Sequence, residues 1–298
     1  MRPLHVAVIV KAGRPAALER DNRATGLFSY GVDEFTFDYV PLTKNTHVDS
    51  VRFNNHYDLI FHYDGPLELT FNNLHIPYVY YSIDSSLSIE HHYLPRYHQA
   101  QHADMVLIDH DRLDRFMVSG RNGSKVFRLS HCVNDKVFYD YGLPKTVDVA
   151  FHCNNGGSDD TRSKIRQHLH EVCKNNGWKY ASGALGLQEY ARSMNAAKVT
   201  VNWPRTPANR PHRVFDSLAC RTCLLTGPLP DVSDEFRVGG LHYYQFEFDD
   251  LHASLTAALQ GDSWKRSADA GYEMVMKHHV WSIRARELRE LLHVELGL

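Results

Sequence analysis

The chain has 298 residues, of which 43% are hydrophobic and 23% are charged, and its formal net charge is −2 with histidine neutral. These values are typical of a globular protein with room for two domains, and the charge excludes a global basic footprint for nucleic acid. No run of about 18 apolar residues occurs, so we expect no transmembrane helix. The lack of a signal-peptide pattern and the five scattered cysteines predict a cytoplasmic protein with free thiols.

The first half of the chain alternates apolar strands with helical lengths. Strands are predicted at residues 4–10, 35–40, 57–65, 77–84, 103–108 and 124–131. Strands separated by helical lengths indicate a parallel βαβ sheet.

The first strand ends in a glycine-containing loop that carries Lys11 and Arg14. Ligands bind at the carboxyl ends of strands in open α/β sheets. These cations therefore predict contact with an acidic acceptor or with donor phosphates. The alternative is a solvated helix face, because basic residues continue at Arg20 and Arg23.

The most informative stretch runs from residue 199 to residue 227. It predicts a buried strand ending in Asn202, a polar loop, a short helix and a second buried strand at Cys223–Thr226. Pro211 suits the first turn of that helix, because its missing N–H would have no intrahelical partner there. Asn209 is a candidate cap.

This helix has the features of a binding site for a diphosphate. A helix N-terminus offers free N–H donors and the positive end of a dipole. His212 lies there, and Arg205, Arg210 and Arg213 add positive charge. Asp216, about one turn further along the predicted polar face, could accept two hydroxyl hydrogen bonds from a ribose. The alternative is a surface helix with an ordinary Arg–Asp pair.

Three segments carry a resemblance to a known family. Residues 213–221 read Arg-Val-Phe-Asp-Ser-Leu-Ala-Cys-Arg, residues 224–226 read Leu-Leu-Thr, and residues 279–284 read His-Val-Trp-Ser-Ile-Arg. They resemble the C-terminal half of GT-B glycosyltransferases, especially the family of the spore maturation protein CgeB. Asp216 replaces the family's Glu, which shortens the reach to a ribose. Arg221 replaces its Gly, so the turn after the helix lacks the residue that adopts positive φ most readily.

The resemblance implies an α/β fold of the GT-B class, with two Rossmann-like domains facing each other across a cleft. It implies an N-terminal acceptor domain at 1–138, a nucleotide-sugar domain at 148–280 and a C-terminal helix at 281–298 that packs back on the first domain. Residues 139–147 are the expected linker. Further strands are predicted at 148–153 and 242–246, and helices at 161–175, 188–196, 250–259 and 272–296.

The implied activity is transfer of a hexosyl or pentosyl group from a nucleotide-diphosphate sugar, UDP-linked or similar, to an acceptor hydroxyl. No metal or other cofactor is expected, because GT-B enzymes do not usually need one and no Asp-x-Asp motif lies in a suitable loop. Arg213 would hold the diphosphate and Asp216 the ribose. A glycine loop with Asn154 and Gly156 is either a second phosphate contact or an ordinary turn.

Inverting transfer needs a base near the acceptor hydroxyl. Asp84, at the end of a central strand, is the first candidate, and its alternative role is a helix N-cap. His131, at the end of the last strand of that half, is the second. The Glu-x7-Glu motif of retaining GT-B families is not intact, because Ala208 stands eight residues before Asp216, and this favours inversion.

Two alternatives stay open. The chain could be a non-catalytic nucleotide-sugar-binding protein. It could also act on a hydroxymethylated base of phage DNA, a role in which compact CgeB-like transferases occur. The near-neutral charge argues against tight DNA binding, whereas the local basic segment at residues 11–23 leaves it open.

Overall fold

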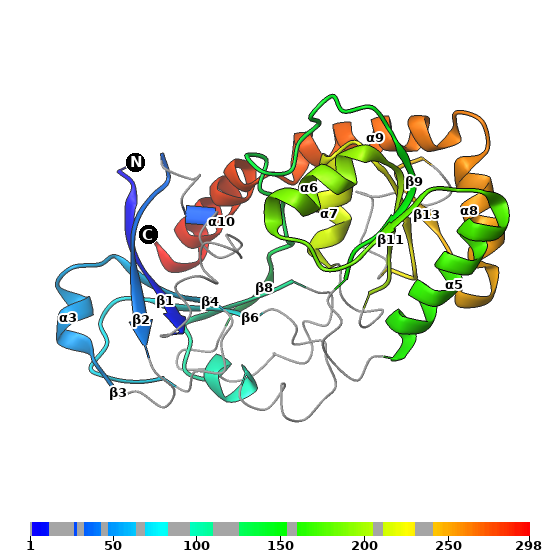
Figure 1. Ribbon diagram of the computed structural model, residues 1–298. Coiled ribbons are helices and arrows are strands. Elements are labelled where there is room, and N and C mark those ends of the chain that lie inside the picture. Colours follow the sequence, from blue (N-terminus) through cyan, green and yellow to red (C-terminus); the bar gives the residue numbers. More distant parts are fainter. Residues whose placement is uncertain are drawn as a thin grey trace. The chain divides into compact units, whose positions relative to one another are not determined.

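The computed structural model describes residues 2–11, 27–28, 33–42, 47–63, 69–82, 96–109, 125–153, 160–204, 211–229 and 241–298. The chain divides into two compact units (Figure 1). The first unit is Met1–Ser130 with Trp281–Leu298, and the second is His131–Val280. Within the described ranges, no helix is long and apolar enough to cross a membrane.

The first unit is built on a six-stranded sheet in the order β2-β1-β4-β6-β7-β8. All neighbouring strands in it are parallel. The strands are β1 Leu4–Lys11, β2 Phe35–Leu42, β4 Leu59–Tyr63, β6 Tyr78–Ser82, β7 Met105–Ile108 and β8 Lys125–Arg128. The six strands predicted in this half are therefore confirmed.

A smaller element of the first unit was not predicted. Strands β3 His47–Asp49 and β5 Thr70–Asn72 pair in parallel, and helix α3 Ser50–Asn54 follows β3. Three-residue strands are too short to show the alternation on which the sequence prediction depends.

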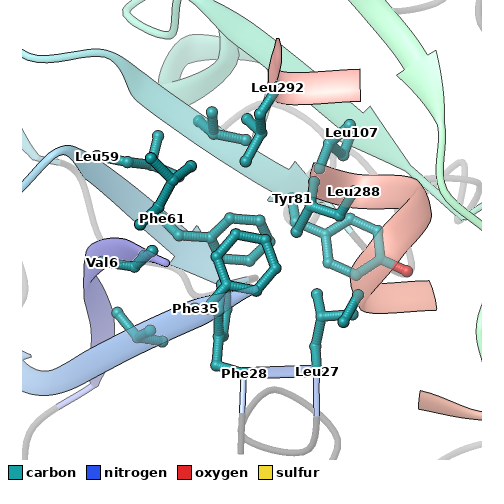
Figure 2. Packing of buried hydrophobic residues seen from close by; sticks show 14 of the residues in the cluster. Val6, Leu27, Phe28, Phe35, Leu59, Phe61, Tyr81, Leu107, Leu288 and Leu292 are labelled. Carbon is teal, nitrogen blue, oxygen red and sulfur yellow. The ribbon is translucent and has the colours of Figure 1, made fainter. Parts of the chain in front are cut away.

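The C-terminal helix α10, Trp281–Leu296, belongs to the core of the first unit. Figure 2 shows Leu288 of α10 beside the Tyr81 ring, and Leu288 and Leu292 belong to the same buried cluster as Phe35 and Phe61. The Lys125 ammonium of β8 also pairs with the Glu295 carboxylate at 2.7 Å. The prediction that the C-terminal helix packs back on the first domain is confirmed.

The predicted single helix at residues 272–296 is wrong. The chain forms α9, Ser263–His278, and then α10, with a break at His279 and Val280. Val280 makes an isolated parallel bridge to Val133, whose N–H donates to the His279 carbonyl at 2.8 Å. The break therefore comes from pairing with a distant segment.

The second unit is built on a parallel five-stranded sheet in the order β10-β9-β11-β12-β13. The strands are β9 Val147–Phe151, β10 Tyr180–Ser182, β11 Ala197–Asn202, β12 Cys223–Thr226 and β13 Tyr244–Gln245. The helices are α5 Asp160–Asn176, α6 Leu187–Ala196, α7 His212–Ala219, the 3₁₀ helix η3 Phe248–Asp250, α8 Leu251–Leu259 and α9. Apolar residues of α5 and α8 share one core cluster with the central strands.

Residues 131–138, expected at the end of the first domain, lie in the second unit. Beside the Val133 hydrogen bond, the Phe138 ring lies edge-on to the Tyr190 ring of α6, with centroids 5.8 Å apart. The expected linker at 139–147 lies inside the same unit. Asn195 of α6 anchors its start, accepting from the Tyr141 N–H at 2.8 Å.

Candidate functional site

The carboxyl ends of β11 and β12 form a polar edge in the second unit. Asn202 and Thr226, the last residues of these strands, are partners in the register and are fully buried. The Asn202 Nδ2 donates to Thr226 Oγ1 at 2.9 Å, and the Thr226 hydroxyl contacts the Gly227 carbonyl at 3.0 Å. The Asn202 amide is therefore fixed at the edge where ligands bind in such sheets.

Arg213, in the first turn of α7, is anchored to that edge. Its Nε donates to Asn202 Oδ1 at 3.1 Å. The guanidinium's other N–H donors have no hydrogen bond or ion pair in the part of the chain that the structure describes. A guanidinium held by a neutral amide keeps its charge and most of its donors for an anion.

Helix α7 starts later in the chain than predicted. Pro211 is the N-cap, with φ −68° and ψ 151°, and the helix begins at His212. The prediction that Pro211 lies in the first turn is wrong, because its extended ψ leaves it outside the helix. No side-chain cap hydrogen bond is present at Pro211. The proposed cap Asn209 lies outside the described residues.

His131 and His212 are brought together. Their ring centroids are 3.7 Å apart, with 33° between the ring planes. Only 6% of His131 is exposed. Two residues predicted for different roles, a base and a donor contact, thus meet at the first turn of α7.

The predicted polar face of α7 is buried. Asp216 is 4% exposed and Ser217 is 1% exposed, as covered as the apolar residues beside them. Helix α9 packs so closely on α7 that a Cβ on Gly271 would lie 2.6 Å from Leu218 Cδ2. Burial, and next the negative charge of Asp216, raise the pKa of the Cys220 thiol well above its usual value. Because Asp216 and Ser217 are buried, the alternative that α7 is a surface helix is wrong.

Arg221 closes the C-terminal end of α7 in the left-handed conformation, with φ 50°. Its N–H donates to the Leu218 carbonyl at 3.0 Å, and the Thr222 N–H donates to the Ser217 carbonyl at 3.3 Å, the two bonds of a Schellman motif. The turn therefore adopts a positive φ even though an arginine stands where the family has glycine. The Arg221 guanidinium forms ion pairs with two carboxylates. Its Nε lies 2.7 Å from Asp269 Oδ1, and its Nη1 lies 3.2 Å from Asp140 Oδ2.

Two cations of α5 reach the carboxyl ends of neighbouring strands. Arg162 donates to the Trp203 carbonyl, just after β11, at 3.2 Å. Arg166 donates to Cys153 Sγ, just after β9, at 2.9 Å. Their spacing of four residues places both arginines on one helix face, but the sequence analysis did not assign them to the site. Asn202 and Thr226 were also not assigned to the site. The sequence feature that could have indicated them is a polar residue at the end of an apolar strand.

Several predicted site residues lie outside the described residues: Arg14, Asp84, Asn154, Gly156, Arg205 and Arg210. Lys11 is the last residue of β1. Among the described residues, no group of three His, Cys, Asp or Glu side chains could hold a metal ion.

Part of the chain is similar to a known family. Residues 150–290 match the family described as "Glycosyl transferase-like". None of the curated proteins matches the sequence.

The fold is similar to those of several solved structures. Sucrose-phosphate synthase from Thermosynechococcus elongatus is 12% identical, with a TM-score of 0.65 over 99% of both chains. An α-glucosyltransferase in complex with UDP-glucose and DNA containing an abasic site is 10% identical, with a TM-score of 0.65 over 97% of this chain and 99% of that one. Anabaena Alr3699/HepE in complex with UDP-glucose is 11% identical, with a TM-score of 0.63 over 98% and 100%. The chain therefore has the GT-B fold of two Rossmann-like units, as the sequence predicted.

Proposed function

We propose that the chain is a glycosyltransferase that moves a sugar from a nucleotide-diphosphate sugar to an acceptor hydroxyl. The observation that carries this proposal is Arg213, a cation in the first turn of α7 that is fixed by Asn202 and has no carboxylate partner among the described residues. The helix N-terminus and the guanidinium together suit a diphosphate. The glycosyl transferase-like match spans this region.

The remaining donor contacts follow from the parallel sheet. Strands β9 and β11 are parallel neighbours, so Phe151 and Asn202, their last residues, lie at the same edge of the sheet. We assign Asn154, Gly156, Arg205 and Arg210, which follow these strands in the sequence, to the phosphates together with His212. Asp216, one turn beyond His212, is assigned to the ribose.

Transfer breaks the bond from the anomeric carbon to the diphosphate oxygen and forms a bond to the acceptor oxygen. Arg213 and backbone N–H groups would stabilise the charge on the departing diphosphate without requiring a metal. In an inverting reaction the acceptor proton passes to a base, and Asp84 is the residue we assign to that role. Loss of activity in Asp84→Asn with unchanged donor affinity is the expected result.

The finer class rests on the motifs at residues 213–221 and 279–284, which favour a CgeB-like hexosyl- or pentosyltransferase. A hydroxymethylated DNA base is the second candidate acceptor. It is supported by the fold shared with an α-glucosyltransferase in complex with UDP and a 13-mer DNA containing an HMU base. Lys11 and Arg14 are the residues that we would test for contact with such an acceptor.

A thermal-shift screen of UDP-, GDP-, ADP-, CDP- and dTDP-sugars tests the proposal. A donor present at about 100 times its Kd should stabilise the folded state by about 2.7 kcal/mol. Release of nucleoside diphosphate is then measured with free sugars and with hydroxymethylated DNA as acceptors. Stabilisation without any release would favour a non-catalytic binding protein, and no stabilisation by any donor would contradict the proposal.

A further inference from the structure

The chain passes between the two units twice, and the two passing segments lie together inside the second unit. The first unit ends at Ser130 and resumes at Trp281. Just inside these limits, Val133 donates to the His279 carbonyl at 2.8 Å and pairs with Val280. Residues 131–133 and 279–280 are called the crossing segments below.

Both crossing segments contact α7. The His131 ring packs against that of His212, the first residue of the helix, with centroids 3.7 Å apart and 33° between the ring planes. His279, which is 1% exposed, lies 5.3 Å from the Phe215 ring. The helix is therefore fixed by one ring contact at its start and by another one turn later.

We propose that His131 is a positioning residue, which holds the first turn of α7 through His212 so that Arg213 meets the donor's diphosphate. This inference rests on the function proposed above. A first turn is the end of a helix that frays, because its N–H groups have no intrahelical partners. Pro211 supplies no side-chain cap, so the contact between the His131 and His212 rings fixes this turn together with the Arg213–Asn202 hydrogen bond.

The same geometry argues against His131 as the base. A general base must come within about 2.6–3.2 Å of the acceptor hydroxyl. The centroid of the His131 ring lies 3.7 Å from that of His212, so this side of the ring is closed to an acceptor hydroxyl. A ring packed against a donor-binding residue is suited to holding that residue, and Asp84 remains the assigned base.

Two variants of the full-length chain separate the roles. His131→Ala removes the ring, whereas His131→Phe keeps a flat ring that cannot take a proton. If His131 positions α7, His131→Ala should weaken nucleoside diphosphate binding about 2- to 10-fold, the effect of losing one aromatic pair. His131→Phe should bind within about twofold of the wild type and keep its rate of donor hydrolysis. A base would give the opposite pattern, with intact binding and about a 10²–10⁴-fold lower rate in His131→Phe.

A double-mutant cycle tests whether His131 affects nucleotide binding through His212. Because His131 acts through His212, the variant lacking both rings should bind no more weakly than His212→Ala. His168→Ala is the matched control, since it removes an imidazole stacked on Phe248 at 5.9 Å in the same unit. Its donor affinity should equal that of the wild type.

Calorimetric titration with UDP, GDP, ADP, CDP and dTDP gives these affinities, and urea unfolding confirms that each variant is folded. Unchanged affinity in His131→Ala, or a His131→Phe variant as weak as His131→Ala, would overturn the positioning role alone. Failure of the wild type to bind any of the five nucleotides would instead overturn the proposed donor function.

Discussion

Arg213 and Asn202 meet at the end of β11, where the Nε of the arginine donates to the amide oxygen at 3.1 Å. The Asn202 amide in turn donates to the Thr226 hydroxyl, so two neutral side chains orient the charged Arg213 side chain. Neutral anchoring leaves the guanidinium's charge uncancelled, which is what a site for an anion requires.

Replacing Arg213 by alanine should weaken nucleoside diphosphate binding by about 1.5–3 kcal/mol, the value of a charge-assisted hydrogen bond. Arg213→Lys should recover part of this loss, because it restores the charge but not the planar fork. Arg266→Ala, at an exposed position of α9, is the control and should bind normally. Calorimetry with equal affinities for all variants would remove Arg213 from the site.

The C-terminal end of α7 gives a prediction about stability. Alanine at position 221 would lose the Asp140 and Asp269 contacts and keep a Cβ at φ 50°. Glycine would lose the same contacts without that steric cost, so Arg221→Gly should be more stable than Arg221→Ala by about 1 kcal/mol. Urea unfolding measures the difference. An alanine variant as stable as the glycine variant would show that the left-handed turn does not persist.

The stretch around α7 was predictable because its signals are local. Two apolar strands flank a loop rich in proline and arginine, and the order of β11, α7 and β12 follows from that pattern. The partners of the site residues are not local. Asn202 meets Thr226 through the parallel register, and Asp216 is buried by tertiary packing that the local pattern does not show.

The break between α9 and α10 was also unpredictable, because it depends on a contact with a distant segment. Residues 272–296 have a helical pattern throughout, and the interruption is created by Val133, far away in the sequence. The local hydrophobic pattern does not predict pairing with a segment that is distant in the sequence. The partners of the Arg221 side chain were not predictable for a related reason, since Asp140 and Asp269 lie in distant segments.

The close approach of α9 to α7 can be tested at Gly271. A Cβ there would lie 2.6 Å from Leu218 Cδ2 and 2.9 Å from the backbone oxygen of His242. Gly271→Ala should therefore destabilise the protein by about 1–3 kcal/mol, despite alanine's better helix propensity. Gly186→Ala, whose nearest neighbour would be 3.7 Å away, is the control. A Gly271→Ala variant as stable as the wild type would mean that the two helices are further apart.

His62, fully buried in β4, makes stability depend on pH. Burial lowers the pKa of His62 from 6.5 to about 3. Its Nδ1 lies within hydrogen-bond distance of the Tyr78 hydroxyl, at 2.7 Å, and Gln99 donates to that hydroxyl at 2.8 Å. The unfolded chain binds a proton near pH 6.5 and the folded chain does not, so stability is lost as the pH falls from about 6.5 towards 3.

The slope from this one group is at most about 1.4 kcal/mol per pH unit. His62→Gln should flatten the fall in unfolding free energy between pH 7 and pH 5, measured by urea unfolding. His102→Gln, at an exposed position, should leave the wild-type slope unchanged. Parallel curves for His62→Gln and the wild type would contradict a neutral, buried His62.

Hydrogen–deuterium exchange of the full-length chain, with and without the nucleoside diphosphate that binds most tightly, tests the site most directly. We predict slower exchange at residues 211–219 and at the ends of β11 and β12, residues 200–204 and 223–227, because the diphosphate would cover the first turn of α7 and the polar edge beside it. Slower exchange confined to residues 1–130, with residues 211–219 unchanged, would contradict a donor site at α7.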